Sequence, residues 1–121
     1  MKISRVAEIL EAKVLTGGEN LDFEVHSACG SDMMSDVLAY VKNQAVLLTG
    51  LVNSQVIRTA EMMDMVCIVF VRSKQPTPDM IALAEASGLV VMTTGMRMYE
   101  ACGKLYANGL TGLDKAGDAD E

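Results

Sequence analysis

Hydrophobic and polar positions are arranged in repeating blocks along the middle of the chain. Three continuous apolar runs begin at Ala45, Met65 and Leu89, and the first two lead into segments in which apolar residues recur at helical spacing. Uninterrupted apolar runs of five or six residues are typical of parallel strands that are buried on both faces. The pattern therefore predicts a strand–helix unit that repeats every twenty residues or slightly more, with right-handed crossovers.

Two further strands are predicted before this repeat. Residues 13–16 form a short apolar stretch that ends at the turn-forming pair Gly17-Gly18. Residues 23–27 alternate apolar and polar side chains, which is typical of a strand with one solvated face, so we place this strand near the edge of the sheet. Residues 66–71 are the most apolar and β-branched, so we place them at its centre.

Helices are predicted around these strands wherever apolar residues recur at helical spacing. They are expected at residues 3–10, 33–41, 54–63, 78–87 and 98–106. Ser31 or Asp32 is expected to cap the second helix, Asn53 or Ser54 the third, and Thr77 the fourth. Together these elements predict a mixed, mainly parallel sheet of about five strands, covered by helices on both faces.

Length and composition indicate one globular domain. The chain has 121 residues and half of them are hydrophobic, which is enough for a sizeable core. No apolar run approaches the roughly 20 residues that a membrane span needs, and the charged first helix does not resemble a signal peptide. We expect a domain over residues 1–110, followed by an acidic, flexible tail over residues 111–121, in a cytoplasmic protein without a membrane partner.

Charge and cysteine content narrow the classes of function. The formal net charge is −6 and no basic stripe is present, so nucleic acid is not an expected partner. Cys29, Cys67 and Cys102 are far apart in sequence, and with a single histidine they offer no spacing for zinc or an iron–sulfur cluster. We predict neither a metal nor a cofactor, and the scattered cysteines suit a reducing compartment.

Polar and basic residues follow each of the three central strands. In an open parallel sheet, ligands bind outside the carboxyl ends of the strands, near helix N-termini. These loops carry the candidate ligand-binding residues Thr49, Asn53, Ser54, Arg72, Ser73, Lys74, Thr94 and Arg97. Such a set suits a small anion, such as a phosphate or a nucleotide. The alternative is that they are ordinary caps and solvated loops, because the motifs GxxxxGK[ST], GxGxxG, HExxH and GxSxG are absent.

The central repeat also follows a characteristic order of motifs. The order comprises a strand and loop before Val56-Ile57 and Ala60, an apolar strand at 66–71, a helix with Pro78 and Ala84, and a strand at 89–94 that ends in threonine. Over most of residues 33–107 this order resembles the DRTGG domain family. Two segments depart from the family motif. Leu51-Val52 stands in place of Asp-Arg after the first strand, and Arg72-Ser73-Lys74 in place of Thr-Gly-Gly after the second.

The resemblance implies a three-layer α/β/α domain. It is similar to the N-terminal domain of HPr kinase/phosphorylase and to the DRTGG domains of phosphotransacetylases and CBS-domain proteins, which are regulatory or assembly modules. The first hypothesis is therefore a non-catalytic regulatory module that self-associates and binds a small anion. The second is an accessory protein that binds a metabolic or redox enzyme, because some free-standing family members are encoded near iron-only hydrogenase genes. The third is a small-molecule enzyme that acts at the same loops, although the spacing pairs no nucleophile with a base and predicts no catalytic residue.

Self-association is expected to give a homodimer. The chain is rich in methionine, with ten in all, and the edge strand predicted at residues 23–27 would leave backbone groups unpaired. Family members are association modules, and two-fold symmetry is the usual arrangement for a pair. We expect the interface around Met33-Met34 and Met62-Met63.

Overall fold

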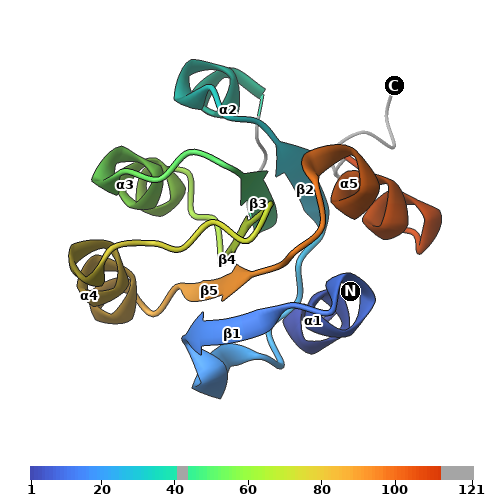
Figure 1. Ribbon diagram of the computed structural model, residues 1–121, viewed down its shortest axis with the longest axis horizontal. Coiled ribbons are helices and arrows are strands. Elements are labelled where there is room, and N and C mark those ends of the chain that lie inside the picture. Colours follow the sequence, from blue (N-terminus) through green and yellow to red (C-terminus); the bar gives the residue numbers. More distant parts are fainter. Residues whose placement is uncertain (41–43, 113–121) are drawn as a thin grey trace.

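The computed structural model describes residues 1–40 and 44–112, which form an α/β domain with helices on both faces of one sheet (Figure 1). The strands are β1 (Lys13–Thr16), β2 (Ser27–Gly30), β3 (Ala45–Thr49), β4 (Cys67–Phe70) and β5 (Val90–Thr93). The helices are α1 (Ile3–Leu10), α2 (Met34–Tyr40), α3 (Ser54–Met62), α4 (Pro78–Ser87) and α5 (Met98–Ala107), with a short 3₁₀ turn at Gly18–Asn20. The predicted fold class is confirmed.

The sheet has the strand order β1-β5-β4-β3-β2. Strands β2 to β5 are parallel to their neighbours, and β1 runs antiparallel to β5 at one edge. The strand predicted from residues 66–71 lies at the centre, as expected, and every residue of β3, β4 and β5 is buried. Because these strands are covered on both faces, their sequences are continuous apolar runs.

Two hydrophobic clusters lie on opposite faces of the sheet. Helices α1 and α5 pack on one face, and α2, α3 and α4 pack on the other (Figure 1). Ile68 and Val69 of β4 point to opposite clusters, as neighbouring strand residues must. The central strand therefore joins both halves of the core.

The predicted helix boundaries at α3 and α4 are confirmed by their caps. The Asn53 side chain accepts a hydrogen bond from the Gln55 amide at 3.0 Å, and the Thr77 hydroxyl accepts one from the Met80 amide at 3.3 Å. Gly88 ends α4 in the left-handed conformation, with φ at 72°. That conformation favours glycine because it has no Cβ.

The strand predicted at residues 23–27 is placed wrongly. Phe23 to His26 form no strand, and the edge strand β2 begins only at Ser27, where it pairs with β3. Of the two apolar residues in this segment, Val25 is fully buried but Phe23 is about half exposed, so the alternation does not mark a strand with one buried face. Residues 29 and 30, which lie beyond the predicted strand, belong to β2.

The outer side of β2 is covered by the end of the described chain. The Ala28 amide donates to the Thr111 carbonyl at 3.0 Å, and Leu110 is buried in the core. The backbone that we expected to favour pairing with a second copy is therefore partly engaged within the chain. The expected tail begins at residue 111, and its residues 113–121 lie outside the described part, as does the predicted end of the second helix at residue 41.

No helix within residues 1–40 and 44–112 is both long enough and apolar enough to cross a membrane.

Candidate functional site

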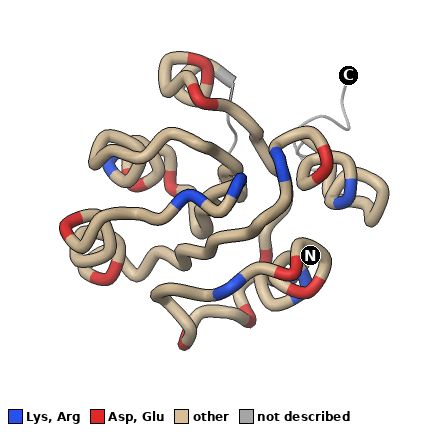
Figure 2. The backbone as a smooth tube through the Cα atoms, in the orientation of Figure 1, with Lys and Arg blue, Asp and Glu red and all other residues tan. Residues whose placement is uncertain are grey.

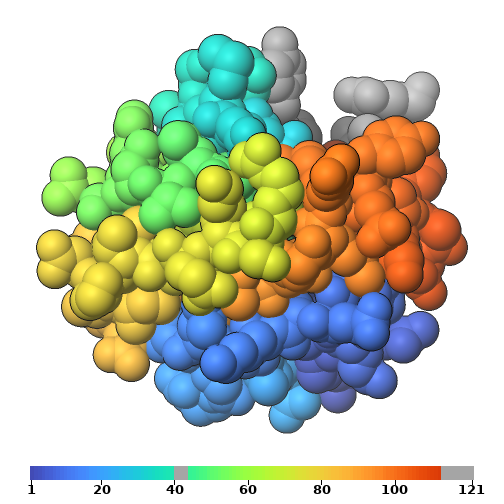
Figure 3. All heavy atoms as spheres, viewed as in Figure 1, coloured from blue at the N-terminus to red at the C-terminus, as the bar shows by residue number. Residues whose placement is uncertain are grey.

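The carboxyl ends of β2 to β5 lie at one edge of the sheet because these strands are parallel. The loops that leave this edge enclose a cavity of about 410 Å³. Its lining residues are Gly30, Ser31, Asp32, Val71, Arg72, Arg97 and Met98. In the space-filling view, the segment after β4 (yellow-green) lies against the segment after β5 (orange) (Figure 3).

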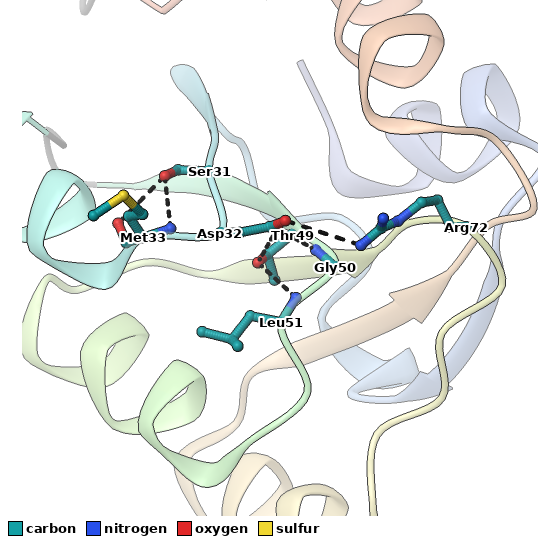
Figure 4. Close-up of polar contacts among 7 residues, drawn as sticks. All are labelled: Ser31, Asp32, Met33, Thr49, Gly50, Leu51 and Arg72. Atoms are coloured by element: carbon teal, nitrogen blue, oxygen red, sulfur yellow. Dashed lines mark hydrogen bonds and ion pairs between the residues drawn. The ribbon is translucent and has the colours of Figure 1, made fainter.

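Asp32 connects three of these loops (Figure 4). One carboxylate oxygen, Oδ1, accepts hydrogen bonds from the Gly50 amide at 2.7 Å and from the Thr49 hydroxyl at 3.1 Å. The other oxygen, Oδ2, lies 3.9 Å from Nη2 of Arg72. A side chain that follows β2 thus holds the end of β3 and faces a cation from the loop after β4.

Gly50 makes room for the Arg72 side chain. A Cβ atom at position 50 would collide with the Arg72 guanidinium, which packs against this part of the backbone. The absence of a side chain at Gly50 therefore leaves room for the Arg72 guanidinium beside the amide that donates to Asp32.

The backbone around Arg72 adopts an unusual conformation. Arg72 and Ser73 have φ values of 58° and 57°, in the left-handed region that non-glycine residues rarely occupy. Their amides donate to the carbonyls of Met96 and Thr94, each at 2.8 Å, so the turn is tied to the loop after β5. Of these two residues, Ser73 is the one that stands where the resemblance to the family motif places a glycine.

The cavity combines two cations with one carboxylate. Arg72 and Arg97 come from different loops and both are exposed, and Lys and Arg positions occur in the loops after β4 and β5 (Figure 2). Arg72 faces Asp32, whereas Arg97 forms no ion pair within the described residues. The lining therefore carries a net charge of one positive unit, which suits an anion.

The structure brings only two of the eight candidate ligand residues to the lining of this cavity, Arg72 and Arg97. Thr49 lies beneath it and is fully buried, with its hydroxyl donating to Asp32. Ser73 and Lys74 are exposed beside the cavity but do not line it.

The other three candidates serve the fold. Asn53 caps α3, and Ser54 is its first residue. Thr94 is buried, and its hydroxyl donates to the Leu10 carbonyl at 2.7 Å, which ties the loop after β5 to the end of α1.

Sequence reasoning missed the role of Asp32. The sequence offers Ser31 and Asp32 as caps of the second helix, but α2 begins at Met34, and the Ser31 hydroxyl accepts from the Met33 amide at 3.0 Å, before the helix starts. The Asp32 carboxylate instead reaches the end of β3. Asp32 could be identified from its position just after a parallel strand, at the edge where the strand ends meet. With the strand predicted at residues 23–27, Asp32 is too far from the strand end for this position to be recognised.

A second, apolar hollow of about 600 Å³ adjoins the first, and Met98 lines both. Its lining residues on α5 are Met98, Tyr99, Cys102, Gly103, Tyr106 and Ala107. The Tyr99 side chain is 93% exposed and that of Tyr106 is 66% exposed. The buried face of this helix is formed instead by Ala101 and Leu105.

The three cysteines are not arranged as a metal site. Within the described residues, no group of three or more His, Cys, Asp and Glu side chains is placed to hold a metal ion. Burial raises the pKa of the Cys67 thiol far above its usual value. Burial also raises the pKa of Cys102, and that of Cys29, to which the neighbouring Cys102 adds a smaller effect. All three are therefore predominantly neutral thiols near neutral pH.

The fold is an α/β domain whose mainly parallel sheet carries a cavity at the carboxyl edge of its strands. The family model described as DRTGG domain matches residues 5–106, and the chain belongs to this family. Among solved structures, the CBS and DRTGG domains of the regulatory region of Clostridium perfringens pyrophosphatase, complexed with the activator diadenosine tetraphosphate, share its fold with a TM-score of 0.68. The two chains are 14% identical, and the match covers 83% of this chain but only 44% of the other. No curated protein sequence matches this chain.

Proposed function

We propose that this DRTGG domain is a non-catalytic regulatory module that binds a small phosphate-bearing anion in the cavity beside Asp32, Arg72 and Arg97. The observation that carries the proposal is that two arginines from separate loops line one cavity, and that Arg97 has no ion-pair partner in the described part of the chain. Arginine is well suited to phosphate because its planar guanidinium presents several donors. The regulatory region of the C. perfringens pyrophosphatase, which was complexed with a dinucleoside polyphosphate, supports this class of ligand.

A non-catalytic role is supported by the state of the polar groups in the cavity. The Asp32 carboxylate is engaged by the Gly50 amide and the Thr49 hydroxyl, and the Ser31 hydroxyl donates to the Met33 carbonyl. Neither group is placed as a nucleophile beside a base, which an enzyme acting at these loops would require.

Calorimetric titration with inorganic pyrophosphate and ATP tests the proposal. The wild-type protein is expected to bind at submillimolar to millimolar concentration, as an exposed site with two arginines should. Arg97→Gln is expected to weaken binding by about 10- to 100-fold, because a hydrogen bond to a charged group contributes about 1.5–3 kcal/mol. Lys74→Gln is the matched control, since it removes the same charge from a neighbouring loop but outside the cavity lining. Equal losses in both variants would show only general attraction of anions.

We further propose that the domain self-associates through the exposed face of α5. Tyr99 and Tyr106 lie seven residues apart on this helix, on either side of Gly103, over which the surface is open. A tyrosine buries about 150–250 Å² in an interface. Two such residues from each of two copies would contribute on the order of 600 Å², a large part of the roughly 1,200–2,000 Å² of a stable interface.

This surface replaces the one that we expected from the methionines. Met34 is buried in the core, whereas Met33 and Met62 are exposed on separate helices or loops; the face of α5 joins two exposed tyrosines to one apolar hollow. Light scattering coupled to size exclusion should show a dimer for the wild-type chain and a monomer for the double variant Tyr99→Glu, Tyr106→Glu. Met62→Glu is the control on α3 and should remain a dimer. A wild-type monomer at all concentrations would refute self-association and would leave this face to a different protein, such as the metabolic or redox enzyme of the accessory hypothesis.

A further inference from the structure

The Asp32 carboxylate lies at the carboxyl edge of the parallel strands, the edge at which open parallel sheets bind ligands. In an open parallel sheet, the amide and hydroxyl donors at the end of a strand are available to ligands. Here the Gly50 amide and the Thr49 hydroxyl, both at the end of β3, donate to Asp32 Oδ1 at 2.7 and 3.1 Å (Figure 4). The chain thus supplies its own anion at this edge.

The ion pair of Asp32 with Arg72 is weaker than the two hydrogen bonds that Asp32 accepts from the end of β3. The separation of 3.9 Å between Asp32 Oδ2 and Arg72 Nη2 is at the limit of an ion pair, and both side chains are about half exposed. Exposed pairs of this kind add little to stability. Arg72 can therefore leave Asp32 for a stronger anion without disturbing the two hydrogen bonds that fix the carboxylate.

We propose that Asp32 is a specificity-determining residue that competes with ligands for Arg72 and so makes the site favour pyrophosphate groups over a single phosphate. This inference rests on the proposed function and concerns the same cavity. A single phosphate gains the attraction of Arg97 but meets repulsion from Asp32. A pyrophosphate group has enough charge and enough oxygens to bind Arg97 and to draw Arg72 away from Asp32.

The variant Asp32→Asn separates charge from structure. An asparagine keeps an oxygen that accepts from the Gly50 amide and the Thr49 hydroxyl, but it removes the negative charge. Asp79→Asn is the matched control, because Asp79 is an exposed acid in the first turn of α4, at the same edge of the sheet, and does not line the cavity. Asp32→Ser is a second neutral variant, and thermal unfolding confirms that each variant is folded.

The experiment is a calorimetric titration of these proteins with inorganic phosphate and inorganic pyrophosphate at fixed ionic strength. Asp32→Asn is expected to bind phosphate roughly three- to tenfold more tightly than wild type, from the removal of one nearby unit charge in a partly solvated cavity. The affinity for phosphate is expected to rise more than the affinity for pyrophosphate, because a pyrophosphate group already draws Arg72 away from Asp32 in the wild type. The preference for pyrophosphate should therefore narrow. Asp79→Asn is expected to change either affinity less than about twofold, as a screened, distant charge should.

The possible results separate the inference from the proposed function. A phosphate affinity that does not rise in either Asp32 variant, while the wild type still binds pyrophosphate, would overturn the competition and leave the proposed function intact. An equal gain in Asp79→Asn would also overturn it, because net charge alone would then explain the effect. Absence of binding in the wild type and in every variant would refute the proposed function, and the inference with it. Binding of phosphate by the Asp32 variants but not by the wild type would support the inference that Asp32 competes with the ligand for Arg72.

Discussion

Replacing Ser73 by glycine should make the protein more stable. Ser73 has a φ of 57° in the turn after β4, and its exposed hydroxyl makes no side-chain hydrogen bond to any residue that the structure describes. A non-glycine residue in the left-handed region is disfavoured by about 1–2 kcal/mol. Glycine removes that strain, while its greater freedom in the unfolded chain costs about 0.4–1 kcal/mol. The expected net gain for Ser73→Gly is therefore about 0.5–1 kcal/mol in the free energy of unfolding.

Two further variants isolate the backbone effect. Ser73→Ala also loses the hydroxyl but keeps a Cβ, so it should be no more stable than wild type. Ala82→Gly introduces a glycine at an exposed position within α4, where the backbone is helical, and should destabilise the protein by about 1 kcal/mol. The same residue type should thus act in opposite directions at the two positions.

Urea unfolding and thermal unfolding followed by circular dichroism measure these differences. For a chain of this size, a gain of 1 kcal/mol raises Tm by about 4 °C, so Ser73→Gly should melt about 2–4 °C above wild type. The reasoning fails if Ser73→Gly is less stable than Ser73→Ala, because the turn would then not be strained in solution.

Three other predictions test the core, a candidate site residue and the thiols. Ile68→Asp should unfold the protein at a cost above about 3 kcal/mol, since it places an unpaired charge in the fully buried central strand, and a cooperatively melting variant would contradict this. Thr94→Val should destabilise the protein by about 1–3 kcal/mol, because the Leu10 carbonyl loses its buried donor; unchanged urea unfolding would show that this hydrogen bond contributes nothing. Burial raises the thiol pKa of both Cys102 and Cys67, so Cys102 should react with a thiol reagent more slowly than free cysteine at pH 8 and faster as the pH rises towards its pKa. The fully buried Cys67 should react only on unfolding, and rapid labelling of Cys67 in native protein would refute its placement.

Much of the fold is predictable because buried parallel strands leave a local signal. The runs that become β3, β4 and β5 are apolar at every position, and this requires no knowledge of their neighbours. The edge strand β2 has the sequence Ser-Ala-Cys-Gly, which is neither continuously apolar nor β-branched. It is a strand because it pairs with β3 and because Thr111 lies against its outer side. Those contacts come from distant parts of the chain, so the local pattern does not reveal them.

The candidate site also has residues that the sequence predicts and residues whose role depends on distant contacts. Arg72 and Arg97 were predictable because both follow parallel strands, whose ends share one edge. The role of Asp32 depends on the direction of its side chain, which is set by the position of β2 relative to β3. Arg72 lines the cavity and Lys74 does not, because the backbone turns in the left-handed conformation at Arg72 and Ser73. The sequence does not predict this turn, since it has no glycine there.

The strained turn itself favours a functional interpretation of Arg72. Strain of about 1–2 kcal/mol at a residue persists only when the surroundings hold it, and it is common at ligand sites. Here the amides of Arg72 and Ser73 are held by the loop after β5, and Gly50 leaves open the space that the Arg72 guanidinium fills. A glycine at position 72 would fit this backbone better, but it would remove the cation that faces Asp32 and the cavity. A fold under selection for stability alone would favour glycine at both positions of this turn. We therefore interpret the strain at Arg72 as retained for the charge that it presents, whereas the strain at Ser73, whose side chain does not line the cavity, has no such compensation.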